Sequence, residues 1–141
     1  MALGACYVVL REGYDRAGGF CPFFHTWGKS EQDISARMWI TGLGVKCVTA
    51  ARVGHLSRSK FPYPVRWADI EFNQVAMVRS VFEEPVAQAI EQMMQPLPKE
   101  VETWLAQVNF CAWRQWIQSH RQISDAEFFH RFVPDALECL N

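Results

Sequence analysis

The pattern of hydrophobic and polar positions changes near residue 65 of the chain. Before that point, two short apolar runs, 5–10 and 45–50, are bounded by glycines and are typical of buried strands. Between the two runs, apolar residues recur at helical spacing from Ser30 to about Thr41, and glycines follow directly. The first 65 residues are therefore expected to form a strand, a helix and a second strand.

After residue 65, apolar residues keep a helical spacing and prolines separate the stretches. The predicted helices are Trp67–Glu83, Val86–Gln95, Lys99–His120 with a break near Asn109, and Ser124–Phe132. We thus expect an α/β (α+β) fold. A short mixed-sheet portion over residues 1–65 is followed by a helical tail over residues 66–141, and the two pack as one globular unit.

Composition narrows the class of protein. With 141 residues, half of them hydrophobic, the chain is long enough for one domain with its own core. A formal net charge of −1 and dispersed basic residues exclude the basic surface that nucleic acid requires.

No long apolar run and no signal-peptide pattern is present, so a cytoplasmic location is expected. The five cysteines have no CxxC spacing, which disfavours a disulfide framework or a zinc ribbon.

The start of the helix predicted at Ser30 carries acidic residues. In Ser30-Glu31-Gln32-Asp33, the serine hydroxyl can accept a first-turn amide and Asp33 can reach back to the cap. This is the pattern of a capping box. Two interpretations stay open, because the carboxylates can cap the helix only, or can cap it and also act chemically.

Several short motifs follow one another along the first half of the chain. They are Gly4–Val9, Gly18-Gly19-Phe20, Trp27-Gly28, Ile34-Ser35-x-Arg37-x-Trp39, Gly42 and Val53-Gly54-His55-x-x-Arg58. In this order they resemble the C-terminal catalytic half of a GT-A glycosyltransferase, of the family 2-like and polypeptide GalNAc-transferase-like kind. The resemblance covers residues 3–65. It implies hexosyl transfer from a nucleotide-sugar to a glycan or other hydroxyl acceptor.

The resemblance also implies a divalent cation, which neutralises charge on the leaving diphosphate. His55 occupies the place of the histidine that adds a metal ligand in the GalNAc-transferase-like members. Because imidazole suits Mn²⁺ better than Mg²⁺, the resemblance favours Mn²⁺. The other interpretation of His55 is a histidine that is hydrogen-bonded in a turn at the end of a strand.

An inverting enzyme of this kind needs a carboxylate that takes the proton of the acceptor hydroxyl. Related enzymes often carry a Glu-Asp pair after Trp-Gly-x, and the matching positions here are Ser30 and Glu31. Serine replaces the first acid, so Glu31 is the preferred catalytic base and Asp33 the second candidate. A retaining enzyme needs no such base, and the stereochemical outcome stays open.

The resemblance assigns further residues to the two sides of the site. Arg58, Lys60 and Tyr63 are expected near the diphosphate or the donor sugar, since arginine suits bidentate phosphate contacts. On the acceptor side we expect Trp27, Gly28 and His25. In the alternative interpretation, the basic residues are solvated surface and the aromatic residues are packing anchors.

The chain contains no DxD motif and no nucleotide-binding βαβ segment before the matched stretch. The resemblance therefore implies half of a site, and a separate nucleotide-binding half-domain as a partner. We expect little or no transfer by the 141-residue chain alone. The alternative function is a non-catalytic protein-interaction module derived from a glycosyltransferase. A hydrolase has no recognisable nucleophile motif to support it.

Overall fold

The computed structural model describes residues 6–56 and 60–135, and these residues contain seven α-helices. They are α1 (Arg11–Arg16), α2 (Ser30–Ile40), α3 (Trp67–Val81), α4 (Glu84–Met93), α5 (Lys99–Gln107), α6 (Cys111–His120) and α7 (Asp125–Phe132). Each helix predicted for the tail is present. The break expected near Asn109 separates α5 from α6.

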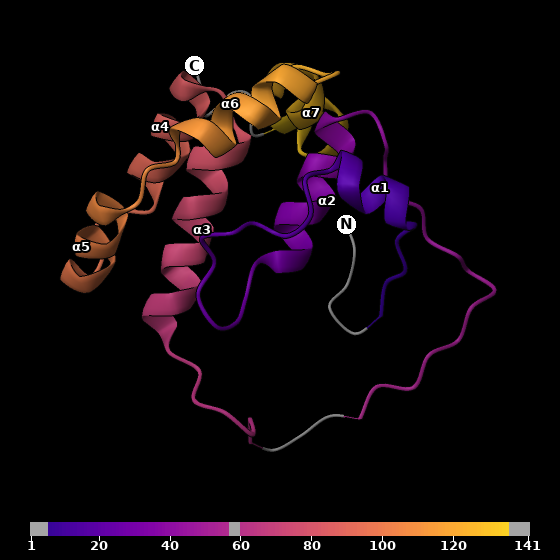
Figure 1. Ribbon diagram of the computed structural model, residues 1–141, viewed down its shortest axis with the longest axis horizontal. Coiled ribbons are helices and arrows are strands. Elements are labelled where there is room, and N and C mark those ends of the chain that lie inside the picture. Colours follow the sequence, from indigo (N-terminus) through magenta and orange to yellow (C-terminus); the bar gives the residue numbers. More distant parts are fainter. Residues whose placement is uncertain (1–5, 57–59, 136–141) are drawn as a thin grey trace.

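Helix α3 is the central element, and it contacts α2, α4, α5 and α6 (Figure 1). Its first half packs against α5, and its second half packs against α2 and α4, so its apolar residues join two separate core clusters. The first cluster contains Ala68, Phe72, Val75, Ala76, Val101 and Leu105. The second contains Ala36, Ile40, Val78, Val81, Phe82 and Ala87, with Phe128 and Phe129 of α7 packed against it.

The predicted mixed sheet is wrong, because the described residues form no strand and the fold is helical. Of the first apolar run, residues 6–10 are described, and Val8 and Leu10 are 92% and 80% exposed. The second run is also exposed, with Val48 at 68%. A strand needs a neighbour that pairs its backbone N–H and C=O groups. Apolar, β-branched composition favours a strand but does not supply that neighbour.

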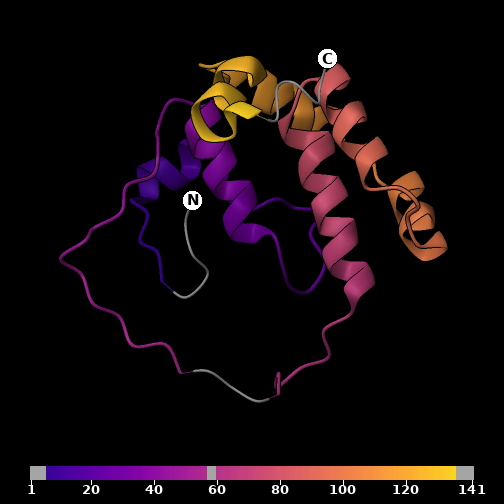
Figure 2. The ribbon, with the colours of Figure 1, turned by 180° about the vertical axis from the view of Figure 1, so that it is seen from behind.

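Residues 45–56 and 60–66 run outside the helical body between α2 and α3, as two opposite views show (Figures 1 and 2). Residues 45–50 were expected to be a buried strand, yet the only backbone hydrogen bond described within 45–56 is a turn in which Ala51 N–H donates to the Val48 carbonyl, at 3.0 Å. Within the described residues, each helix is too short or too polar to cross a bilayer.

The start of α2 differs from the predicted capping box. Ser30 is the first helical residue, and the N-cap position is Lys29, whose φ of 72° lies in the left-handed region. No side chain caps this end. Gly28, with φ of 99°, precedes Lys29, so two successive residues with positive φ turn the chain into the helix. The backbone therefore sets the beginning of α2, and the Ser30 hydroxyl does not.

A second capping-box pattern, Ser124-Asp125-Ala126-Glu127, predicts an N-cap at Ser124, and this N-cap is confirmed. Ser124 precedes α7 in an extended conformation, and its Oγ accepts a hydrogen bond from the Glu127 N–H at 3.1 Å.

Cys21 is the buried cysteine of the described residues, whereas Cys6, Cys47 and Cys111 are exposed free thiols. Burial, and secondarily the negative charge of Asp33, raises the pKa of Cys21 to about 12. At neutral pH this thiol is protonated and unreactive.

Candidate functional site

The loop before α2 is held against α3 by two polar side chains. Asn73 accepts a hydrogen bond from the His25 N–H at 2.7 Å. Its amide donates to the carbonyls of Trp27 at 3.2 Å and Gly28 at 3.0 Å. Asn73 is fully buried, so it replaces water for the backbone groups of this loop. The Trp-Gly turn is thus fixed on the face of α3.

His25 lies in this loop beside a buried carboxylate. Its Nδ1 is 3.3 Å from Asp69 Oδ1, and the hydroxyl of Thr26 donates to Asp69 Oδ2 at 3.0 Å. The imidazole stacks on Phe72, with ring centroids 4.1 Å apart, and meets Trp104 edge-on. Its side chain is 32% exposed, against 8% for Asp69. The imidazole is therefore oriented by the carboxylate and by the aromatic rings, and part of it reaches the surface.

Three aromatic side chains gather next to this loop. The ring centroids of Trp27 and Phe61 are 5.3 Å apart, and those of Phe61 and Tyr63 are 5.9 Å apart. Each of the three is more than two-fifths exposed. We call Trp27, Phe61 and Tyr63 the aromatic cluster. The structure thus brings Trp27, which is predicted for the acceptor side, into one cluster with Tyr63, which is predicted for the donor side.

The two acidic candidates at the start of α2 lie in different surroundings. Asp33 is fully buried, and its Oδ2 accepts a hydrogen bond from Arg37 Nε at 3.1 Å. The Arg37 guanidinium also forms an ion pair with Asp33 and donates to the Ala17 carbonyl. Glu31, by contrast, is partly exposed. Asp33 is thus committed to Arg37, while Glu31 can be reached from solvent.

Tyr7 lies near Glu31. Its pKa is raised, first by burial and then by the negative charge of Glu31. Its side chain is 38% exposed.

His55 is exposed on the segment outside the helical body. Lys60 is exposed as well, and Arg58 lies outside the described residues. Nowhere in the described residues do three His, Cys, Asp or Glu side chains come together as metal ligands. The imidazole of His55 alone does not make a metal-binding site, because Mn²⁺ takes several nitrogen or oxygen ligands. The described residues do not by themselves fit a bound cation.

Sequence reasoning missed Asp69, Asn73 and Arg37 as residues that organise the site. A signal for the first two exists, since they stand four residues apart on the same side of the helix as the apolar positions Phe72 and Ala76. A polar residue on this side of the helix needs a partner inside the protein. Which loop supplies that partner cannot be read from the helix itself.

Comparisons with known proteins support the resemblance over part of the chain. It is 32% identical over 62 residues to polypeptide N-acetylgalactosaminyltransferase 10 of Mus musculus and of Homo sapiens. This match covers 44% of the chain and 10% of the relative. It is 33% identical over 60 residues to polypeptide N-acetylgalactosaminyltransferase 14 of Homo sapiens, covering 43% of the chain and 11% of that relative. A putative polypeptide N-acetylgalactosaminyltransferase 9 of Drosophila melanogaster gives 32% over 63 residues, which are 45% of the chain and 10% of that relative.

The matches span about a tenth of the length of these relatives. No family model matches the chain, and no solved structure is similar to it. Over nearly half of its length, this chain is related to the polypeptide N-acetylgalactosaminyltransferases and is glycosyltransferase-like.

Proposed function

We propose that this chain supplies the acceptor side of a sugar-transfer site, in which a hexose moves from a nucleotide-sugar to a hydroxyl acceptor. The observation that carries the proposal is the similarity to polypeptide N-acetylgalactosaminyltransferases over 62 residues. Within the proposal, the matched stretch corresponds to the C-terminal half of a GT-A catalytic domain. The names of the relatives favour N-acetylgalactosamine as the sugar and a polypeptide as the acceptor. The cytoplasmic location stays a prediction.

The aromatic cluster supports the acceptor role in this proposal. Exposed aromatic rings bind the apolar faces of ligands, and the loop that carries Trp27 is held in place by Asn73. A binding group fixed in this way loses little entropy when the ligand arrives. Trp27 and Tyr63 are therefore proposed to position the acceptor and the donor sugar beside each other.

Glu31 is proposed as the group that receives the proton of the acceptor hydroxyl. It is the reachable carboxylate of the two candidates, since the carboxylate of Asp33 is buried against Arg37. In an inverting transfer, the hydroxyl oxygen bonds to the anomeric carbon, the proton passes to Glu31, and the diphosphate leaves. Asp33 then has the separate role of holding α2 in place.

His55 is proposed as one ligand of a divalent cation, with Mn²⁺ preferred. The cation, when bound, would offset charge on the diphosphate. Its other ligands would come from a nucleotide-binding half-domain, consistent with the exposure of His55. In this proposal Arg58 and Lys60 meet the diphosphate from the same segment.

The test is a calorimetric titration of the full chain with UDP, with Mn²⁺, and with both together. In this titration the diphosphate oxygens of UDP and water would take the places of the missing ligands. We therefore expect weak UDP binding that depends on Mn²⁺ and weakens at least tenfold further in His55→Ala, a change of about 1.4 kcal/mol. His130→Ala is the matched control, because His130 is exposed on α7 and belongs to no proposed site. It should leave binding unchanged.

A second function, the non-catalytic interaction module, is favoured by one observation. Val53 and Leu56, on the segment outside the helical body, are 59% and 84% exposed, and a partner that covered them would remove this apolar surface from water. Indifference to both Mn²⁺ and UDP would favour this module over transfer. Robust turnover of a UDP-sugar by the 141-residue chain alone would contradict the half-site proposal.

A further inference from the structure

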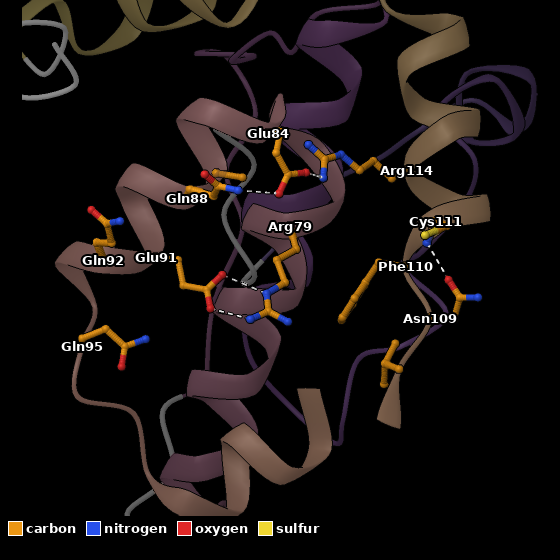
Figure 3. A pocket seen from close by; sticks show the side chains of 12 residues that line it. Arg79, Glu84, Gln88, Glu91, Gln92, Gln95, Asn109, Phe110, Cys111 and Arg114 are labelled. Atoms are coloured by element: carbon orange, nitrogen blue, oxygen red, sulfur yellow. Dashed lines mark hydrogen bonds and ion pairs between the residues drawn. The ribbon is translucent and has the colours of Figure 1, made fainter. Parts of the chain in front are cut away.

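A groove of mixed polar and apolar lining lies between α4 and the connection from α5 to α6, with α3 beneath it (Figure 3). Its volume is about 700 Å³. The groove is separate from the aromatic cluster, and its lining residues come from the helical tail. The side chains that matter most are Arg79, Gln92, Gln95, Asn109, Phe110 and Arg114.

The charges of the groove cancel in pairs. Arg79 binds Glu91 through two hydrogen bonds, one of them 2.8 Å from Nε to Oε2. Arg114 forms an ion pair with Glu84. Each arginine is thus neutralised by a glutamate within the groove, as the dashed lines in Figure 3 show. A strongly charged ligand would have to compete with these pairs, so the groove favours an uncharged one.

Four carboxamides line the groove beside the apolar side chains of Ala87, Val108 and Phe110 and the thiol of Cys111, and one of them, that of Gln88, donates to Glu84 at 2.9 Å. Gln88 and Gln92 lie on α4, Gln95 follows just after the end of that helix, and Asn109 lies on the opposite side of the groove (Figure 3). Within the described residues, the carboxamide of Gln92 has no hydrogen-bond partner. The NH₂ groups of Gln95 and Asn109 also have none there, although their oxygens accept from Leu97 N–H and Cys111 N–H.

A carboxamide can donate to a carbonyl and accept from an N–H at the same time, so it can pair with an exposed peptide backbone. From Gln88 to Gln92, α4 rises about 6 Å at 1.5 Å per residue. An extended chain covers that length with about two residues, and Gln95 adds a further contact position beyond the end of the helix. The row of glutamines therefore matches a short extended strand, and the half-buried Phe110 offers contact to one small side chain.

From these observations we infer that the groove binds an extended, uncharged polypeptide segment of a few residues. The inference holds whether or not the chain takes part in sugar transfer. A saccharide is less well matched, because the groove has one aromatic ring, Phe110, and that ring already packs edge-on against Phe23 at 5.1 Å.

The test is an NMR titration of the ¹⁵N-labelled full chain, which reports backbone amides and side-chain NH₂ groups separately. The probe is an N-acetylated and C-amidated five-residue peptide of alanine, serine and threonine. We expect saturable shifts at residues 88–95 and 108–111, including the Gln92 NH₂ group. Peptides of equal length with two lysines or two glutamates should bind at least about threefold more weakly.

Gln92→Leu should weaken binding of the neutral peptide at least tenfold. Its fold should survive, because no described hydrogen bond involves the Gln92 side chain. Gln115→Leu is the matched control, since Gln115 is exposed on α6 outside the groove. Equal affinity in Gln92→Leu, saturation by a neutral trisaccharide but not by the peptide, or no saturable shift at all would each overturn the inference.

Discussion

At the scale of single residues, the most consequential pair is Asp33 and Arg37. Both side chains are 0% exposed. Arg37 also lies over the ring of Trp113, 5.4 Å from its centroid, so it joins α2, the end of α1 and α6. A buried ion pair contributes little by itself, but losing one partner leaves an uncompensated charge in the interior.

Replacing Arg37 with methionine should lower the free energy of unfolding by about 3–5 kcal/mol, because Asp33 loses its partner while staying buried. Chemical denaturation followed by circular dichroism measures this. Arg11→Met is the control, since Arg11 forms an ion pair with Asp15 at the same four-residue spacing on the exposed surface. A loss in Arg37→Met no larger than in Arg11→Met would contradict the role given to the buried pair.

The same pair gives a pH dependence. Burial raises the pKa of Asp33 and outweighs the opposing effect of Arg37. A carboxyl group whose pKa is higher in the folded than in the unfolded state favours folding most below the unfolded value, and that contribution is lost as pH rises through the folded value. The Arg37→Met variant should therefore recover part of its lost stability on acidification, measured by denaturation at a series of pH values.

At the scale of elements, helices were predictable and strands were not. A helix satisfies its own backbone, so the apolar spacing and the prolines around α3 to α7 carry enough information to place them. A strand depends on a neighbour elsewhere, and the apolar runs at 5–10 and 45–50 could not reveal whether this chain contains one. For the candidate site, the Trp27 loop was predictable as a loop, but its attachment to Asn73 was not.

The two predicted capping boxes make a direct comparison. Ser124→Ala should destabilise the protein by about 0.5–2 kcal/mol, because the Oγ that accepts from Glu127 N–H is lost. Ser30→Ala should lower the free energy of unfolding less than Ser124→Ala does, since Ser30 lies inside α2 and no side chain caps that end. Thermal unfolding of both variants under one set of conditions measures the difference. A larger loss in Ser30→Ala would mean that Ser30 caps α2 after all.

At the scale of the whole molecule, the chain divides into a helical body and a long segment outside it. In the helical body, α3 contacts α2, α4, α5 and α6. In the segment outside it, every residue from 46 to 56 is exposed and Val45 is partly buried. Few backbone hydrogen bonds hold this segment. Segments of this kind open at little cost in free energy.

Brief digestion with trypsin should therefore cut first after Lys46 and Arg52, which are both exposed. Arg79 and Arg114, in α3 and α6, should be cut much later. Mass spectrometry of the fragments identifies the sites, and circular dichroism should show that helicity persists after the first cuts. Early cleavage within α3 would contradict this division of the molecule.

Because Cys21 is buried, the rate at which it is alkylated reports how often the loop that carries Trp27 opens. The residue is 6% exposed and its thiol is unreactive in the folded protein, whereas Cys6, Cys47 and Cys111 are open to reagents. An alkylating agent will modify the exposed cysteines at once and Cys21 only when the loop lifts away. The delay before Cys21 is modified measures how often the loop that carries Trp27 separates from α3, and a bound acceptor should lengthen that delay.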